Sequence, residues 1–271
     1  LVLADTATVK PVSDPWTGGS VVFTVAGDFT LGASAKFDAV GAGWNWVEYT
    51  GEPSPYAVDT FSVDGVTYQT MALGCGYQYI VGGSYGGRGG STSSSWDWRV
   101  KDAYGFANAP FYPGSPNGVL NKNSYRRGGG LIRVHVGGKA TVDGVLDASA
   151  AVDSSSGGAS GGGIWLTAGR FAFGVTARLL AKGGPSWYAS QGGGGRIAIG
   201  TGLTAGQMAS LLSTGVCARR VFGLEDFQAA YPSVTVDVSR GEPTAAGRPT
   251  AGDAGTFAYY PAPKGLAVFV K

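Results

Sequence analysis

A short motif recurs along this chain at a regular distance: a run of glycines followed at once by an apolar strand. It reads GGGLIRVHV at 128–136, GGGIWLTAG at 161–169 and GGGGRIAIG at 192–200. The equivalent residues Val134, Leu166 and Ile199 are 32 and 33 positions apart. A regular repeat of this length indicates stacked units, each of which buries its apolar face only against its neighbours.

Apolar side chains alternate with other residues in each repeat, as in a strand with one face in a core. The predicted core residues are Ile132, Val134, Val136, Ile164, Leu166, Ala168, Ile197 and Ile199.

Stacking the repeats also predicts which outward residues become neighbours. Arg133 should lie beside Val22, Trp165 and Ala198. The neighbours expected for His135 are Thr24, Thr167 and Gly200.

The stretch from 20 to 44 matches the repeat that begins at 128. Val21, Phe23 and Val25 align with the first core strand, and Phe37–Ala39 align with Leu146–Ala148. We therefore expect about four coils of three strands each. The predicted class is all-β, a parallel β-helix or β-solenoid, in which stacking limits the exposed strand edges.

Glycine makes up 48 of the 271 residues, and two explanations are open. Glycines turn the coil where φ must be positive, or they let one backbone approach another closely.

The motifs resemble the glycine-rich β-helix modules of large secreted and surface proteins of Planctomycetes, Verrucomicrobia, Lentisphaerae and similar bacteria. The resemblance covers roughly half of the chain. It is carried by SYGGRGG at 84–90, AYGFANAPFYPGSPNG at 103–118, GGGLIRVHVGGKATVDGVLDAS at 128–149, SGGGIWLTAGRF at 160–171 and GGGGRIAI at 192–199. It implies a right-handed parallel β-helix and export from the cell, and it implies no catalytic residue.

We predict a single β-helix domain over 1–271. Its parts are a first coil at 1–45, an aromatic glycine-rich insertion at 46–127, core coils at 128–202, and a capping helix with terminal strands at 203–271. Thr204 is the expected N-cap of that helix and Gly215 its end. We expect the helix to cover one end of the solenoid.

Composition argues against several kinds of partner. Only 14% of the residues are charged and the net charge is +2, which is too little for a nucleic-acid or anionic-membrane surface. No run of 18 apolar residues is present, so no membrane span is predicted. The low Lys and Glu content favours an extracellular protein.

Few residues form catalytic patterns. Arg133 and His135 share one strand face, where they would either bind an acidic sugar and act in a polysaccharide lyase or form an outward polar ladder. Asp97 with Asp102 is a candidate carboxylate pair for a glycosidase, against ordinary turn or surface roles. Glu225 and Asp226 form a second pair of adjacent carboxylates.

Aromatic side chains give the strongest binding signal, because flat rings stack on sugars or anchor interfaces. The alternative is that they pack the insertion onto the solenoid. The candidates are Trp44, Trp46, Tyr49, Trp96, Trp98, Tyr104, Phe111, Tyr112 and Trp165.

The two cysteines, Cys75 and Cys217, either form one disulfide or serve as small buried side chains, and they are too few for a zinc site. Asp38, Asp143 and Asp147 belong to turns, where Asp bonds its own backbone. A calcium ion at these aspartates is the one cofactor considered.

The expected function is that of a noncatalytic structural or adhesive module that self-associates, forms fibres or contacts other surface proteins. The first twelve residues are a candidate strand for a neighbouring molecule. The alternatives are a polysaccharide lyase or glycoside hydrolase, and a carbohydrate-binding module; these assignments rest on analogy of fold.

Overall fold

The protein is mostly β, with parallel sheets and two helices, in the residues that the computed structural model describes. These residues are 1–14, 18–44, 59–63, 66–70, 72–75, 81–118, 126–152, 157–186, 190–242 and 251–263. No helix among them is long and apolar enough to cross a membrane.

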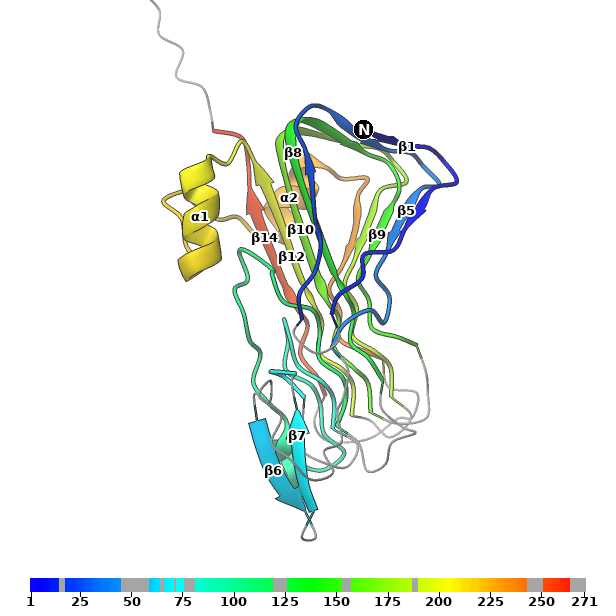
Figure 1. The fold of residues 1–271 in the computed structure, drawn as a ribbon, viewed down its shortest axis with the longest axis vertical. Helices are drawn as coiled ribbons and strands as arrows, with labels where there is room; N and C mark the ends of the chain where they lie inside the picture. The colour runs from blue at the N-terminus through cyan, green and yellow to red at the C-terminus, as the bar shows by residue number, and fades with distance from the viewer. Residues whose placement is uncertain are drawn as a thin grey trace, which may run out of the picture.

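Two parallel sheets face each other across the core (Figure 1). The strands of the larger, sheet A, are β1 (Val2–Leu3), β3 (Val22–Val25), β4 (Phe29–Leu31), β8 (Leu131–Val142), β10 (Gly163–Phe173), β12 (Arg196–Thr201) and β14 (Thr256–Tyr260). Those of sheet B are β2 (Thr8–Val9), β5 (Lys36–Asp38), β9 (Val145–Asp147), β11 (Arg178–Leu180) and β13 (Thr235–Asp237).

The chain passes repeatedly from sheet A to sheet B, and each pass lies parallel to the one before. β4 leads to β5, β8 to β9 and β10 to β11. This alternation confirms the predicted stacking of parallel β units.

The register of sheet A agrees with the sequence alignment. Arg133 pairs with both Val22 and Trp165, and Trp165 pairs with Ala198. In the next outward row, His135 pairs with Thr24 and Thr167. The predicted core residues of β8, β10 and β12 are all buried in one cluster.

β8 and β10 bend where they turn across the top of the molecule in Figure 1. At the bend, two glycines of β8, Gly137 and Gly138, oppose the single Gly169 of β10, which is a β-bulge. β3 pairs with the part of β8 before the bulge and β4 with the part after it. The bend thus divides β8 and β10 into two segments each, which precede β9 and β11 of sheet B.

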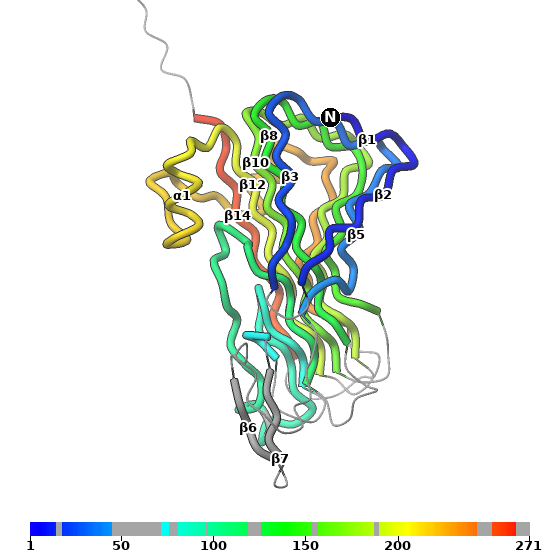
Figure 2. Tube along the Cα trace, viewed as in Figure 1, coloured from blue at the N-terminus to red at the C-terminus, as the bar shows by residue number. Residues whose placement is uncertain are grey.

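Apart from Gly163, which begins β10, the glycine runs belong to neither sheet and form a buried bundle instead, which Figure 2 shows below the sheets. The run 157–163 exchanges backbone hydrogen bonds with five others. These are 81–90, 113–118, 128–130, 181–184 and 190–195. Because a strand in a sheet has only two such neighbours, this arrangement is a bundle.

Donors in the bundle recur every three residues. The amides of Gly158 and Gly161 both donate to the run 190–195, and those of Gly192 and Gly195 both donate to the run 181–184. This period is that of a polyproline-II helix, in which all backbone bonds go to neighbouring chains.

Close backbone approach is therefore why these runs consist of glycine. A Cβ at Gly162 would overlap the carbonyl oxygen of Gly130, and a Cβ at Gly194 would overlap that of Val238. None of the glycines at 82–90, 128–130, 157–163 or 192–195, all described, has a positive φ. The alternative explanation, that these runs need positive φ to turn the coil, is wrong.

The predicted insertion contributes to this bundle. It holds the antiparallel hairpin of β6 (Asp59–Val63) and β7 (Val66–Thr70), followed by a short 3-10 helix, η1 (Ser94–Arg99). Its run at 82–87 donates hydrogen bonds to Gly158 and Gly194 of the core coils.

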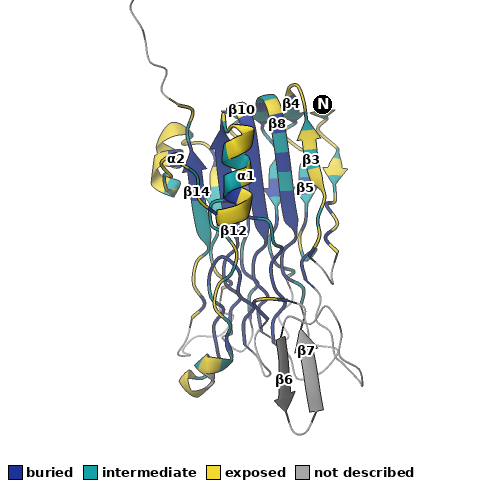
Figure 3. Cartoon of the chain, turned by 60° about the vertical axis from the view of Figure 1, so that its left-hand side comes forward, coloured by how far each residue is buried: buried dark blue, intermediate teal, exposed yellow. Residues whose placement is uncertain are grey.

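Helix α1 (Ala205–Thr214) forms with the predicted ends, since Thr204 makes a capping box with Gln207 and Gly215 adopts φ 70°. Its position differs from the prediction. Leu211 packs with Trp165 and Ala198 on the outer face of sheet A, so α1 covers a flank (Figure 3).

A second helix, α2 (Leu224–Ala230), covers the end of the core instead. Phe227 is fully buried there, and its ring contacts those of Phe173, Tyr231, Phe257 and Tyr259.

Candidate functional site

The outer face of sheet A brings together several of the predicted site residues. Arg133, Trp165 and Ala198 form one outward row because their neighbours in each strand point into the core. His135 lies in the next row. This face is therefore the candidate functional site.

His135 is held in place and neutral. Its Nδ1 lies 2.8 Å from Thr167 Oγ1, and its ring makes a T-shaped contact with the ring of Trp165, with the centroids 5.0 Å apart. Burial, with a further contribution from the charge of Arg133, lowers the pKa of His135 to about 4. At neutral pH the imidazole is uncharged and already hydrogen-bonded.

Arg133 donates through Nη2 to the carbonyl oxygen of Ser20, and burial lowers its pKa. A second arginine, Arg196, is 6% exposed and lies on the same face. Its Nε and Nη2 donate to the Tyr104 carbonyl oxygen at 3.0 and 2.8 Å, and its Nη1 donates to Thr256 Oγ1 at 2.9 Å. The Arg133 guanidinium thus binds the segment before β3, and the Arg196 guanidinium binds both the insertion and β14.

Aromatic rings of the insertion pack around Arg196. Tyr85 is fully buried beneath the guanidinium, with its ring centroid 5.3 Å away, and its ring lies tilted against that of Tyr104, with the centroids 4.9 Å apart. The Tyr104 hydroxyl donates to the Pro113 carbonyl oxygen at 2.6 Å, and Tyr112 contacts the Tyr104 ring. This packing is the alternative role that the sequence left open for the aromatic residues.

The other aromatic candidates divide by exposure. Trp44 and Trp165 are buried, the former against Gly18, whereas Trp98 is 69% exposed beside Arg99. Phe111 contacts Phe106 and Tyr112. Trp46, Tyr49 and the side chain of Trp96 lie outside the described residues.

The candidate carboxylates belong to other parts of the molecule. Arg88, from the GGRGG run, binds Asp97 at 2.7 Å and lies 3.8 Å from Asp102. Glu225 and Asp226 lie in the first turn of α2, where Asp226 accepts the amide of Gly223. Turn and ion-pair roles account for each of these contacts.

Each aspartate considered for calcium accepts hydrogen bonds within the protein, Asp38 and Asp147 from their own turns and Asp143 from the turn between β10 and β11. Asp38 and Asp147 each accept the amide two residues on and share the ammonium of Lys36 at 3.4 and 3.6 Å. Asp143 accepts from the Thr176 hydroxyl at 2.8 Å.

The two cysteines do not form the disulfide that the sequence allowed. No disulfide joins Cys75 and Cys217, and Cys75 is buried with its thiol 3.8 Å from the Asn117 carbonyl oxygen. The second alternative, a small buried side chain, describes Cys75.

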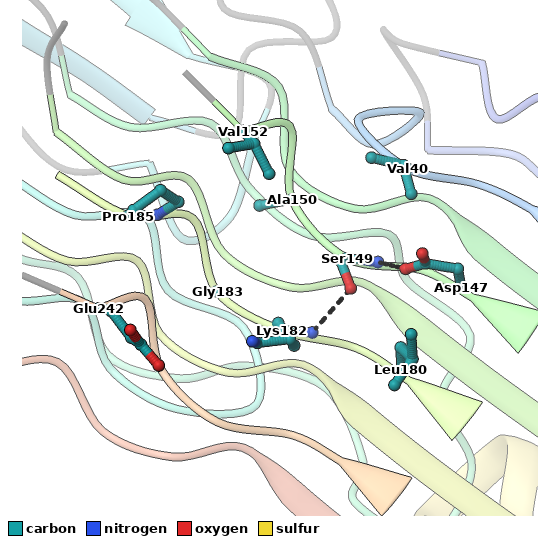
Figure 4. A pocket seen from close by; sticks show the side chains of 10 residues that line it. All are labelled: Val40, Asp147, Ser149, Ala150, Val152, Leu180, Lys182, Gly183, Pro185 and Glu242. Atoms are coloured by element: carbon teal, nitrogen blue, oxygen red, sulfur yellow. Dashed lines mark hydrogen bonds between the residues drawn. The ribbon is translucent and has the colours of Figure 1, made fainter. Parts of the chain in front are cut away.

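A depression of about 370 Å³ opens on the sheet B side (Figure 4). Of its charged residues, Asp147 pairs with Lys36, and Lys182 pairs with Asp237 at 3.5 Å. The walls consist of Val40, Asp147, Ser149, Ala150, Val152, Leu180, Lys182, Gly183, Pro185 and Glu242. Two of its three charged side chains, those of Asp147 and Lys182, are thus engaged within the protein.

A scan against protein-family models gives no match, and searches of curated proteins and of solved structures give none either.

Proposed function

We propose that this chain is a noncatalytic structural or adhesive module of an extracellular bacterial surface or matrix protein, and that it associates with a second copy of itself. In this proposal the parallel passes form a right-handed β-helix. The single observation that supports self-association is the difference between the two ends of the core.

The N-terminal end is open. β1, β2 and β3 each pair on one side only within the described part of the chain. Val2 is 69% exposed and Val22 43%, and the core residues Phe23 and Val25 are only partly buried.

β1 and β2 are only two residues long, but β3 lacks the charges and prolines that protect natural edges. The segment 20–25, SVVFTV, contains no charged residue and no proline. Exposed, uncharged edge strands of β-branched residues are templates for pairing with another chain. The first twelve residues are already used within this molecule, since β1 pairs with β4 and β2 pairs with β5. A second molecule would therefore pair with the outer side of β1, β2 and β3.

At the other end the core is covered, although β13 is the edge strand of sheet B there. Phe227 of α2 fills the core, and Phe222 exchanges backbone hydrogen bonds with Tyr259 on the outer side of β14. A fibre needs two open ends, whereas one open end supports a closed pair in which the same surface is used twice. We therefore propose a dimer joined at its N-terminal edges.

The dimer is tested by sedimentation velocity over a hundredfold range of concentration. We expect a monomer–dimer equilibrium, and we expect Val22→Lys to raise the dissociation constant at least about tenfold, because it adds a charge to the edge. Val175→Lys is the control, since Val175 is 80% exposed in the turn between β10 and β11. A strict monomer at the highest concentration, or equal effects of both variants, would contradict the proposal.

The noncatalytic part of the proposal is tested on pectate, alginate and a glycosaminoglycan. We expect no unsaturated sugar product in the ultraviolet absorbance, because Arg133 and His135 are engaged by Ser20 and Thr167. A general base contributes about 10² to 10⁴ in rate. Turnover that His135→Ala abolishes without loss of fold would instead establish the lyase alternative.

A further inference from the structure

The bulge in β8 places two cations side by side on the outside of the bend. Beyond Gly137 and Gly138, Lys139 pairs directly with Arg170 of β10. Their side chains point away from the core, because the next residues, Ala140 and Phe171, pack into it. Like charges directly opposite one another on neighbouring strands repel.

Neither cation has an ion-pair partner among the residues described here. Asp28, which directly precedes β4, lines the same surface, and its Oδ1 accepts the backbone amide of Lys139 at 2.7 Å. Asp28 therefore supports the bulge and leaves both cationic side chains facing solvent. The three side chains together carry a net positive charge.

A depression of about 330 Å³ lies at this point and is lined by Asp28, Gly137, Gly138, Lys139, Gly169 and Arg170. Half of this lining is glycine, so no side chains cover the floor. Bulges often lie next to functional sites, where they redirect a side chain. Here the bulge brings Lys139, in place of a glycine, opposite Arg170.

The geometry points to a binding site for an oxyanion at Lys139 and Arg170, either a free anion or a sulfate or carboxylate group carried by an acidic polysaccharide. A guanidinium binds such a group through two parallel hydrogen bonds, and an ammonium adds a point charge. The bound anion also cancels the repulsion between the two cations. This site is separate from the N-terminal edge and does not depend on the proposed dimer.

Binding is tested on the whole chain by NMR titration with sodium sulfate against sodium chloride at equal ionic strength, following the amides of Gly137, Gly138 and Gly169. We expect saturable shifts with sulfate only, and a dissociation constant at least about tenfold higher for Lys139→Gln and for Arg170→Gln. Arg178→Gln is the control, because Arg178 is an exposed arginine of β11 outside the depression.

Shifts that are equal in chloride, or equal in all variants, would overturn the proposal. A second titration compares dextran sulfate with neutral dextran of the same length. Tighter binding of dextran sulfate than of sulfate identifies a polymer-borne group, and equal affinity identifies a free anion. Without added anion, both glutamine variants should unfold at the same or a higher urea concentration than the parent. A lower midpoint would show an intramolecular partner and would also overturn the proposal.

Discussion

Replacing Gly162 with valine should lower the free energy of unfolding by about 3 kcal/mol or more, well above the roughly 1 kcal/mol of a propensity change. The Cβ would overlap the Gly130 carbonyl oxygen, which is backbone and cannot rotate away. Gly194→Val should behave alike, because its Cβ would overlap the Val238 carbonyl oxygen. Urea denaturation followed by circular dichroism measures both effects.

Gly27→Val is the matched control for these two variants. Nothing lies within 4 Å of a Cβ at Gly27, and its φ is not positive. Its unfolding midpoint should stay close to that of the parent. An unchanged midpoint for Gly162→Val would show that the glycine runs are loosely packed and that the bundle does not stabilise the fold.

Removing the Phe227 ring, with which α2 covers the end of the core, should have the next largest effect on the free energy of unfolding. Phe227→Ala leaves a cavity among four aromatic rings, and we expect a loss of about 3–5 kcal/mol. Leu212→Ala on α1 is the control, because Leu212 is 45% exposed and its replacement should cost less than about 0.5 kcal/mol. Equal midpoints for the two variants would show that α2 does not close the core.

The 32–33-residue repeat and the alternation of apolar residues within it were sufficient to predict the outward row of sheet A. This row runs from Val22 through Arg133 and Trp165 to Ala198. Such a row needs only a constant offset between coils, and the apolar pattern determines that offset. The ends of α1 were also predictable, since caps are local and Thr204 with Gln207 is a capping box.

Other features depend on contacts that no local pattern contains. An offset of 32 places Arg170 beside Gly138, and only the bulge moves it beside Lys139. The position of α1 depends on which apolar face is left uncovered, here that of Trp165 and Ala198. The sequence likewise left the aromatic residues undecided, because rings that pack and rings that bind have the same composition.

The glycine bundle also affects how stability changes with temperature. Unfolding a sheet core exposes hydrocarbon, which raises the heat capacity, whereas unfolding the bundle exposes mainly peptide groups, which lower it. A molecule with one part of each kind has a smaller heat-capacity change on unfolding than a sheet core of equal length. Its stability curve is correspondingly flatter, so folding stays favourable over a wider range of temperature on both the cold and the warm side.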